Sequence, residues 1–230
     1  STERVEREHA LSALNGIVGD HLLGSGNPLA ITMQFRQNGK TLALHEPSDM
    51  QAIPEVSGRI VILVHGLCMN DMQWSRKTGD GQIYNYGNAL NEDFGLTPVF
   101  LHYNTGLPIS ENGRLFDSQI EALVEAWPVA VDEILIIAHS MGGLVTRKAH
   151  HHAQNKNRKW RKHARKVVFL GTPHHGAPLE RGGHWVDLVL GSTPIASPFA
   201  KIGKIRSIGI TDLRHGLSVA DFPDGLPLPA

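Results

Sequence analysis

The chain has 230 residues, one cysteine, and 22 basic residues balanced by 22 acidic ones. This length suits one domain with a sizeable buried core, and the balanced charge argues against an obligate nucleic-acid-binding protein. The single Cys68 excludes an internal disulfide and a cysteine-only metal site. No apolar run approaches the roughly 18 residues of a membrane span, so we expect a globular domain.

The first 57 residues predict a helix followed by a β-hairpin. Apolar residues recur at three- and four-residue steps across residues 2–23, with charges between them, which favours an amphipathic helix. Short extended runs, Ala30–Arg36 and Thr41–His45, flank Asn38-Gly39, a dipeptide typical of a two-residue hairpin turn. We expect the helix to pack its apolar side on a sheet.

Residues 58–176 alternate apolar runs with amphipathic stretches. Strand–helix–strand alternation with short connections predicts an α/β fold with a mainly parallel sheet flanked by helices. Ligands of such sheets bind beyond the carboxyl ends of the strands, so the residues that follow each strand are the candidates for a functional site. Strands are predicted at residues 59–65, 98–103, 133–138 and 166–170, and helices at residues 71–74, 84–92, 110–127 and 141–154.

A serine stands between the predicted strand 133–138 and the predicted helix 141–154. Ala138-His139-Ser140-Met141-Gly142 matches the nucleophile-elbow pattern, with alanine in place of the first glycine. Such a turn needs small residues two positions before and after the serine, because strand and helix come close together there. We predict that Ser140 is a nucleophile, with His139 and Gly142 supporting the turn. The alternative is a buried strand that ends in small residues by chance.

A second motif, His65-Gly66-Leu67, follows the predicted strand 59–65. A hydrolase with a nucleophile elbow takes one oxyanion donor from the residue after the serine and another from the loop after an earlier strand. By that logic, the backbone N–H groups of Leu67 and Met141 form the oxyanion hole. Gly66 lets the chain turn close to the substrate, and His65 is expected to hydrogen-bond within its loop.

A third motif, Gly171-Thr172-Pro173-His174-His175-Gly176, follows the predicted strand 166–170. Together the three motifs resemble the α/β-hydrolase superfamily, and within it the branch of bacterial triacylglycerol lipases and lipase-like inositol deacylases. The resemblance covers about residues 58–180 and implies an α/β-hydrolase fold with a serine nucleophile, without indicating which ester is cleaved. It also implies a triad in the chain order serine, acid, histidine.

Residues 177–230 are predicted to form a cap or lid, with one helix at residues 185–190 and no clear strand. The nearest acid and histidine in the required order are Asp212 and His215, but they are only three residues apart. Triad members on successive strand loops should be tens of residues apart, so a polar turn or helix cap is the alternative interpretation. We therefore expect residues 1–230 to be the front portion of a single hydrolase domain whose last strands, acid and histidine follow residue 230.

Histidines and basic residues suggest two further sites. Three of the 14 histidines are consecutive at residues 150–152, but on a helix they point in different directions, which favours a solvated surface over a metal site. Lys156–Lys166 holds seven Lys or Arg residues. This segment suits contact with phosphate or an anionic membrane surface, although a solvated helix end is the simpler interpretation.

The sequence as a whole predicts a serine hydrolase that cleaves carboxylic esters, either small molecules or lipids, through an acyl-enzyme on Ser140. No metal or organic cofactor is implied, no nucleic-acid partner is expected, and acyl length and oligomeric state stay open. The charged start and the single cysteine favour the cytoplasm. Two alternatives remain: a non-catalytic hydrolase-like scaffold that binds an acyl compound or a partner protein, and an acyltransferase or thioesterase that uses the same serine.

Overall fold

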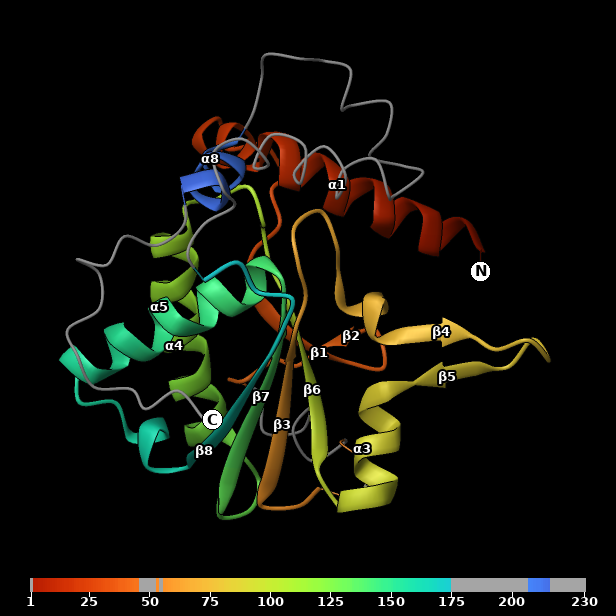
Figure 1. Ribbon diagram of the computed structural model, residues 1–230, viewed down its shortest axis with the longest axis vertical. Coiled ribbons are helices and arrows are strands. Elements are labelled where there is room, and N and C mark those ends of the chain that lie inside the picture. Colours follow the sequence, from red (N-terminus) through yellow and green to blue (C-terminus); the bar gives the residue numbers. More distant parts are fainter. Residues whose placement is uncertain (1, 46–52, 54–55, 175–206, 216–230) are drawn as a thin grey trace.

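A computed structural model describes residues 2–45, 53, 56–174 and 207–215, which form a six-stranded sheet with helices on both faces (Figure 1). The strand order is β2–β1–β6–β3–β7–β8. The last four strands in this order run parallel, and β1 is antiparallel to both of its neighbours. An α/β fold with a mainly parallel sheet is therefore confirmed. The strands are β1 (Gln34–Gln37), β2 (Lys40–Thr41), β3 (Arg59–Val64), β6 (Thr97–His102), β7 (Glu133–His139) and β8 (Ala164–Leu170).

Helices lie on both faces of the sheet and over the carboxyl ends of its parallel strands. α4 and α5 pack together on one face, α3 lies on the other, and α1 and α8 lie over the carboxyl ends of the parallel strands (Figure 1). A separate hairpin of two short strands projects on the α3 side. These elements are α1 (Thr2–Gly24), η1 (Asp71–Trp74), β4 (Ser75–Lys77), β5 (Ile83–Asn85), α3 (Tyr86–Phe94), α4 (Ile109–Ala126), α5 (Met141–Asn155), η2 (Lys159–Lys162) and α8 (Ile208–His215).

After the exposed Arg59, the central strand β3 is apolar because both of its sides are buried. Ile60, Ile62 and Val64 join the large core beneath α4 and α5. Val61 and Leu63 point the other way, into a smaller core on the α3 side. Successive side chains of a strand alternate between the two faces of the sheet. A strand that is covered on both faces therefore has apolar residues at consecutive positions.

The predicted hairpin is confirmed at Asn38-Gly39. Both residues have positive φ (50° and 71°), and Gln37 pairs with Lys40 across the turn. A two-residue hairpin turn of type I′ requires positive φ at both central positions, and asparagine and glycine tolerate positive φ best. The strands are shorter than predicted, because β1 begins only at Gln34.

Several elements differ from the prediction. Residues 84 and 85 belong to β5 rather than to a helix, because Asn85 is the N-cap of α3 and its side chain accepts a hydrogen bond from Asn88 N (2.9 Å). The hairpin of β4 and β5 and the helix α8 were not anticipated. The predicted helix at residues 185–190 lies outside the described residues.

The N-terminal helix α1 is confirmed, but it covers strand ends rather than a sheet face (Figure 1). It packs closely on the loops that follow β3 and β6. A Cβ atom on Gly16 would lie 2.2 Å from Cys68 Sγ, and one on Gly19 would lie 1.9 Å from Asn104 Oδ1. Small residues on this helix therefore let it approach the loops in which ligands of parallel sheets bind.

The run of three histidines on α5 is only partly a solvated surface. His152 Nδ1 lies 2.7 Å from Oδ2 of the buried Asp117, and the His150 ring packs edge-on against Trp160, with ring centroids 6.0 Å apart. Arg158, from the basic segment, also donates to Asp117 (3.0 Å). Part of both clusters thus joins α4, α5 and η2 rather than facing solvent, which corrects the simpler interpretation.

No helix in the described ranges is long and apolar enough to cross a membrane. Within the same ranges, no three His, Cys, Asp or Glu side chains gather as metal ligands would.

Candidate active site

The order of the strands changes direction at β3. The next parallel strand, β6, lies on one side of β3, whereas β7 returns to the other side, and the intervening helices α3 and α4 lie on opposite faces. Open α/β sheets bind ligands beyond the carboxyl ends of the strands at such a point. The register pairs Val64 with Ala138 and His139 with Leu170. The structure therefore brings together the segments that follow β3, β7 and β8. These segments hold the first two motifs and residues 171–174 of the third.

Ser140 stands at a strained turn between β7 and α5. Its backbone has φ 53° and ψ −124°, a region that glycine favours and that costs other residues roughly 1–2 kcal/mol. Hydrogen bonds hold the turn in place: Ser140 N donates to Leu170 O (2.8 Å), and Gly143 N donates to Ser140 O (3.0 Å). The surrounding structure thus imposes a sharp turn on a serine, as a nucleophile elbow does.

Glycines around Ser140 allow the three motifs to pack together. A Cβ atom on Gly142 would lie 2.6 Å from His65 O, and one on Gly143 would lie 2.0 Å from Thr172 Oγ1. A side chain at either position would push α5 away from the loops after β3 and β8. The small residues of the elbow pattern are therefore required by the geometry.

The loop after β3 contacts Ser140 through Gly66. A Cβ atom on Gly66 would lie 3.1 Å from Ser140 Cβ. The following residue, Leu67, and the residue after the serine, Met141, are both buried. No hydrogen bond joins the N–H of either residue to another residue in the described part of the chain. Two unpaired backbone donors thus belong to the two segments that meet at Ser140, as an oxyanion hole requires.

Two histidines lie beside the serine, and each has another partner. Ser140 Oγ is buried and has no hydrogen-bond partner among the described residues. His65 is fully buried, with its Nδ1 3.0 Å from Gly66 O and its ring stacked on Tyr103 (centroids 4.5 Å apart). His139 Nδ1 contacts the side chain of Gln73 instead. His65 therefore hydrogen-bonds within its own loop, and neither histidine makes a hydrogen bond to the Ser140 hydroxyl.

The buried imidazole of His65 predicts an acid-sensitive fold. Burial lowers the pKa of His65 from 6.5 to about 3, so the folded state keeps the ring neutral while an unfolded chain protonates it near pH 6.5. The contribution of His65 to stability is complete above that pH and is lost as the pH falls toward 3, at up to about 1.4 kcal/mol per pH unit.

Urea unfolding measured between about pH 7 and about pH 5 tests this expectation. The free energy of unfolding of the wild type should fall more steeply with acidification than that of His65→Gln. Equal pH dependence in the two proteins would show that His65 is not the titrating group.

A family model described as "Domain of unknown function (DUF7379)" matches residues 29–214. The chain belongs to this family. None of the curated proteins compared with it matches. Two crystal structures of the Bacillus licheniformis lipase BlEst2 are similar to it. The propeptide form is 19% identical, with a TM-score of 0.49 over 70% of this chain and 31% of the lipase chain. The mature form is 18% identical, with a TM-score of 0.46 over 68% of this chain and 55% of the other. This member of the DUF7379 family thus spans 31% and 55% of the two lipase chains.

Asp212 and His215, the acid and histidine singled out by chain order, lie on α8 in this DUF7379 protein. The Asp212 carboxylate accepts a hydrogen bond from Ile109 N (2.9 Å), at the start of α4. This contact satisfies one of the unpaired N–H groups of a helix start. The side chain of His215 is not among the described ones. His174 lies 2.7 Å from Arg147 Nη1, and the two residues after it in the motif, His175 and Gly176, are outside the described ranges.

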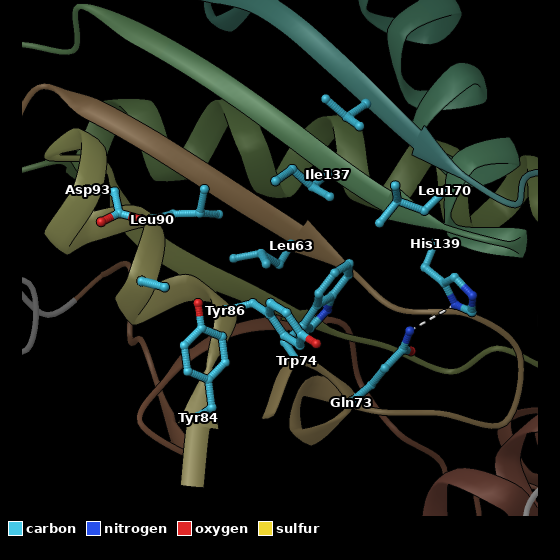
Figure 2. Close-up of a pocket in the computed structure, with 12 residues that line it drawn as sticks. Leu63, Gln73, Trp74, Tyr84, Tyr86, Leu90, Asp93, Ile137, His139 and Leu170 are labelled. Atoms are coloured by element: carbon cyan, nitrogen blue, oxygen red, sulfur yellow. Dashed lines mark hydrogen bonds between the residues drawn. The ribbon is translucent and has the colours of Figure 1, made fainter. Parts of the chain in front are cut away.

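An apolar groove reaches the site from the α3 side of the sheet. It has a volume of about 540 Å³, and His139 and Gln73 lie at one end of it (Figure 2). Its other walls are mainly large apolar and aromatic side chains, which include Leu63, Trp74, Tyr84, Tyr86, Ile137 and Leu170. Of the predicted cap or lid, residues 177–206 and 216–230 lie outside the described residues, and residues 208–215 form α8.

Gln73 is a site residue that the sequence did not reveal. It lies on η1 and connects the loop after β3 to His139 through both ends of its side-chain amide. A glutamine in a short polar stretch carries no signal in a single sequence. Only the folded positions of β3 and β7 show what it connects.

Proposed function

We propose that this protein is a serine hydrolase of the α/β-hydrolase superfamily that cleaves carboxylic esters, of the lipase or esterase type. The observation that carries the proposal is the backbone of Ser140, held at φ 53° and ψ −124° between a buried strand and a helix. Strain of this kind persists only where the surrounding structure maintains it, and such a turn between a strand and a helix is typical of a nucleophilic serine. The neighbouring unpaired N–H groups of Leu67 and Met141 support the same chemistry.

In the proposed reaction, Ser140 Oγ attacks the ester carbonyl, and a general base takes the hydroxyl proton. The two backbone N–H groups stabilise the negative charge on the carbonyl oxygen of the tetrahedral intermediate. Collapse of that intermediate expels the alcohol, which takes up the proton, and leaves an acyl-enzyme that water hydrolyses to the acid and free Ser140. The base and its acid partner are proposed to come from outside the described residues.

A non-catalytic acyl-binding scaffold is the second candidate. One observation favours it: within the described ranges, no histidine makes a hydrogen bond to Ser140 Oγ. Without a base the serine is a weak nucleophile, although oxyanion donors alone keep some catalysis. An acyltransferase or thioesterase would use the same serine and is distinguished by its acceptor.

Reaction with a fluorophosphonate separates these candidates, because such reagents label serines that are activated as nucleophiles. We expect labelling of the complete native gene product, mapped by mass spectrometry to Ser140 and absent in Ser140→Ala. Labelling that persists in this variant, or no labelling of the wild type, would overturn the proposal. Product analysis of p-nitrophenyl butyrate turnover with and without an added alcohol then separates hydrolysis from acyl transfer.

A further inference from the structure

Gln73 is held firmly by the short helix that contains it. Asn70 caps η1 by accepting a hydrogen bond from Met72 N at its side-chain oxygen (3.0 Å), and Gln73 N donates to Asn70 O (3.1 Å). The Asn70 amide in turn donates to Ser12 Oγ on α1 (3.3 Å). The backbone that carries Gln73 is therefore tied both to its own loop and to the helix that covers the strand ends.

The side chain of Gln73 bridges two of the three motifs. Its Oε1 accepts a hydrogen bond from Gly66 N (3.3 Å), and its Nε2 lies 2.8 Å from His139 Nδ1 (Figure 2). One end of the amide thus holds the backbone of the loop after β3. The other end holds the side chain that immediately precedes Ser140.

These two contacts define the protonation state of His139. Because Oε1 accepts from a backbone N–H, the amide nitrogen faces His139 and can only donate. Nδ1 is then the acceptor, so the ring is neutral and carries its proton on Nε2. Burial lowers the pKa of His139, which favours the same neutral form. The carboxylate that shares the groove with His139 is Asp93 on α3.

The bridge lies where Gly66 of the loop approaches the turn. A Cβ atom on Gly66 would lie 3.0 Å from His139 Nδ1 and 3.1 Å from Ser140 Cβ. The next N–H along the chain belongs to Leu67, one of the two proposed oxyanion donors. The separation of Gly66 from the turn therefore determines where that donor lies relative to Ser140 Oγ.

We infer that Gln73 is a positioning residue for the proposed reaction: it clamps the loop that carries the Leu67 donor to the turn that carries Ser140. The inference rests on the proposed function. Oxyanion stabilisation depends on donor placement, and a displacement of about 1 Å can cost about 100-fold in rate. Gln73 itself need not touch the substrate.

Three variants test the clamp in the complete native gene product. Gln73→Leu has a similar size but lacks both hydrogen bonds. Gln73→Glu keeps an acceptor for Gly66 N and offers a second oxygen to His139, whose proton then moves to Nδ1. Gln37→Leu is the matched control, because the Gln37 side chain donates a hydrogen bond to Pro98 O (3.1 Å), near the start of β6.

For p-nitrophenyl butyrate hydrolysis, Gln73→Leu should lower kcat by about 10- to 100-fold with little change in KM. Gln73→Glu should recover most of kcat, and Gln37→Leu should match the wild type. ¹⁵N NMR of the His139 ring, assigned with His139→Gln, should show the proton on Nε2 in the wild type, on Nδ1 in Gln73→Glu and on either nitrogen in Gln73→Leu.

A folded Gln73→Leu variant with wild-type kcat, or an unchanged His139 signal in it, would overturn the clamp and leave the proposed function intact. A loss of kcat in Gln73→Leu that Gln73→Glu does not recover would also overturn it, because Gln73→Glu keeps the hydrogen bond from Gly66 N and should therefore keep the clamp. A wild type without Ser140-dependent turnover would instead overturn the proposed function, and the inference with it.

Discussion

Replacing Ser140 with glycine should abolish the proposed ester hydrolysis and at the same time make the protein more stable. We expect kcat/KM to fall by at least about 1,000-fold, because the acyl-enzyme cannot form and only binding and oxyanion donors remain. The free energy of unfolding should rise by roughly 1 kcal/mol, because glycine adopts φ 53° and ψ −124° without the clash that a Cβ atom causes. Hydrolysis assays and urea unfolding measure the two effects on one protein.

Ser140→Ala is the matched control for this prediction. It removes the hydroxyl and keeps the Cβ atom, so it should be as inactive as the glycine variant without gaining its stability. If both variants unfold at the same urea concentration as the wild type, the turn stores no strain. If either variant keeps wild-type hydrolysis, Ser140 is not the nucleophile.

Local patterns predicted those parts of the fold whose physics is local. After Arg59, the run that ends at Val64 has no polar position, and it forms the central strand, buried on both sides. Asn38-Gly39 forms the predicted turn because two adjacent residues determine its geometry. The turn at Ser140 was anticipated for the same reason: small residues on either side of a serine, between a strand and a helix, are visible in the sequence.

Other features depend on contacts between distant segments, and these were missed. The position of α1 over the strand ends follows from Gly16 and Gly19, whose partners Cys68 and Asn104 are 52 and 85 residues further along the chain. Gln73 connects Gly66 to His139 only because β3 and β7 are adjacent and parallel. His152 was interpreted as solvated because nothing near it in the sequence identifies Asp117 as its partner.

Asp117 is therefore the position where we expect the largest loss of stability. Its carboxylate is fully buried on α4. It accepts three hydrogen bonds, from α5, from η2 and from the segment between them. Oδ2 accepts from His152 Nδ1 (2.7 Å) and Arg158 Nε (3.0 Å), and Oδ1 accepts from Trp160 Nε1 (2.8 Å). One side chain thus joins α4 to α5 and to η2.

Asp117→Ala should lower the free energy of unfolding by about 3–5 kcal/mol, because it leaves Arg158 without its buried partner and the indole N–H of Trp160 unsatisfied. Asp117→Asn should lose less, since its oxygen can still accept from Trp160 while its amide cannot accept from Arg158. Glu111→Ala is the control on the same helix: Glu111 pairs with Arg114 at 2.7 Å, but the pair is exposed and should contribute less than about 1 kcal/mol. Urea unfolding of the three variants measures these differences. If Asp117→Ala loses no more stability than Glu111→Ala, the buried carboxylate does not hold the three elements together, and the histidine run is a solvated surface after all.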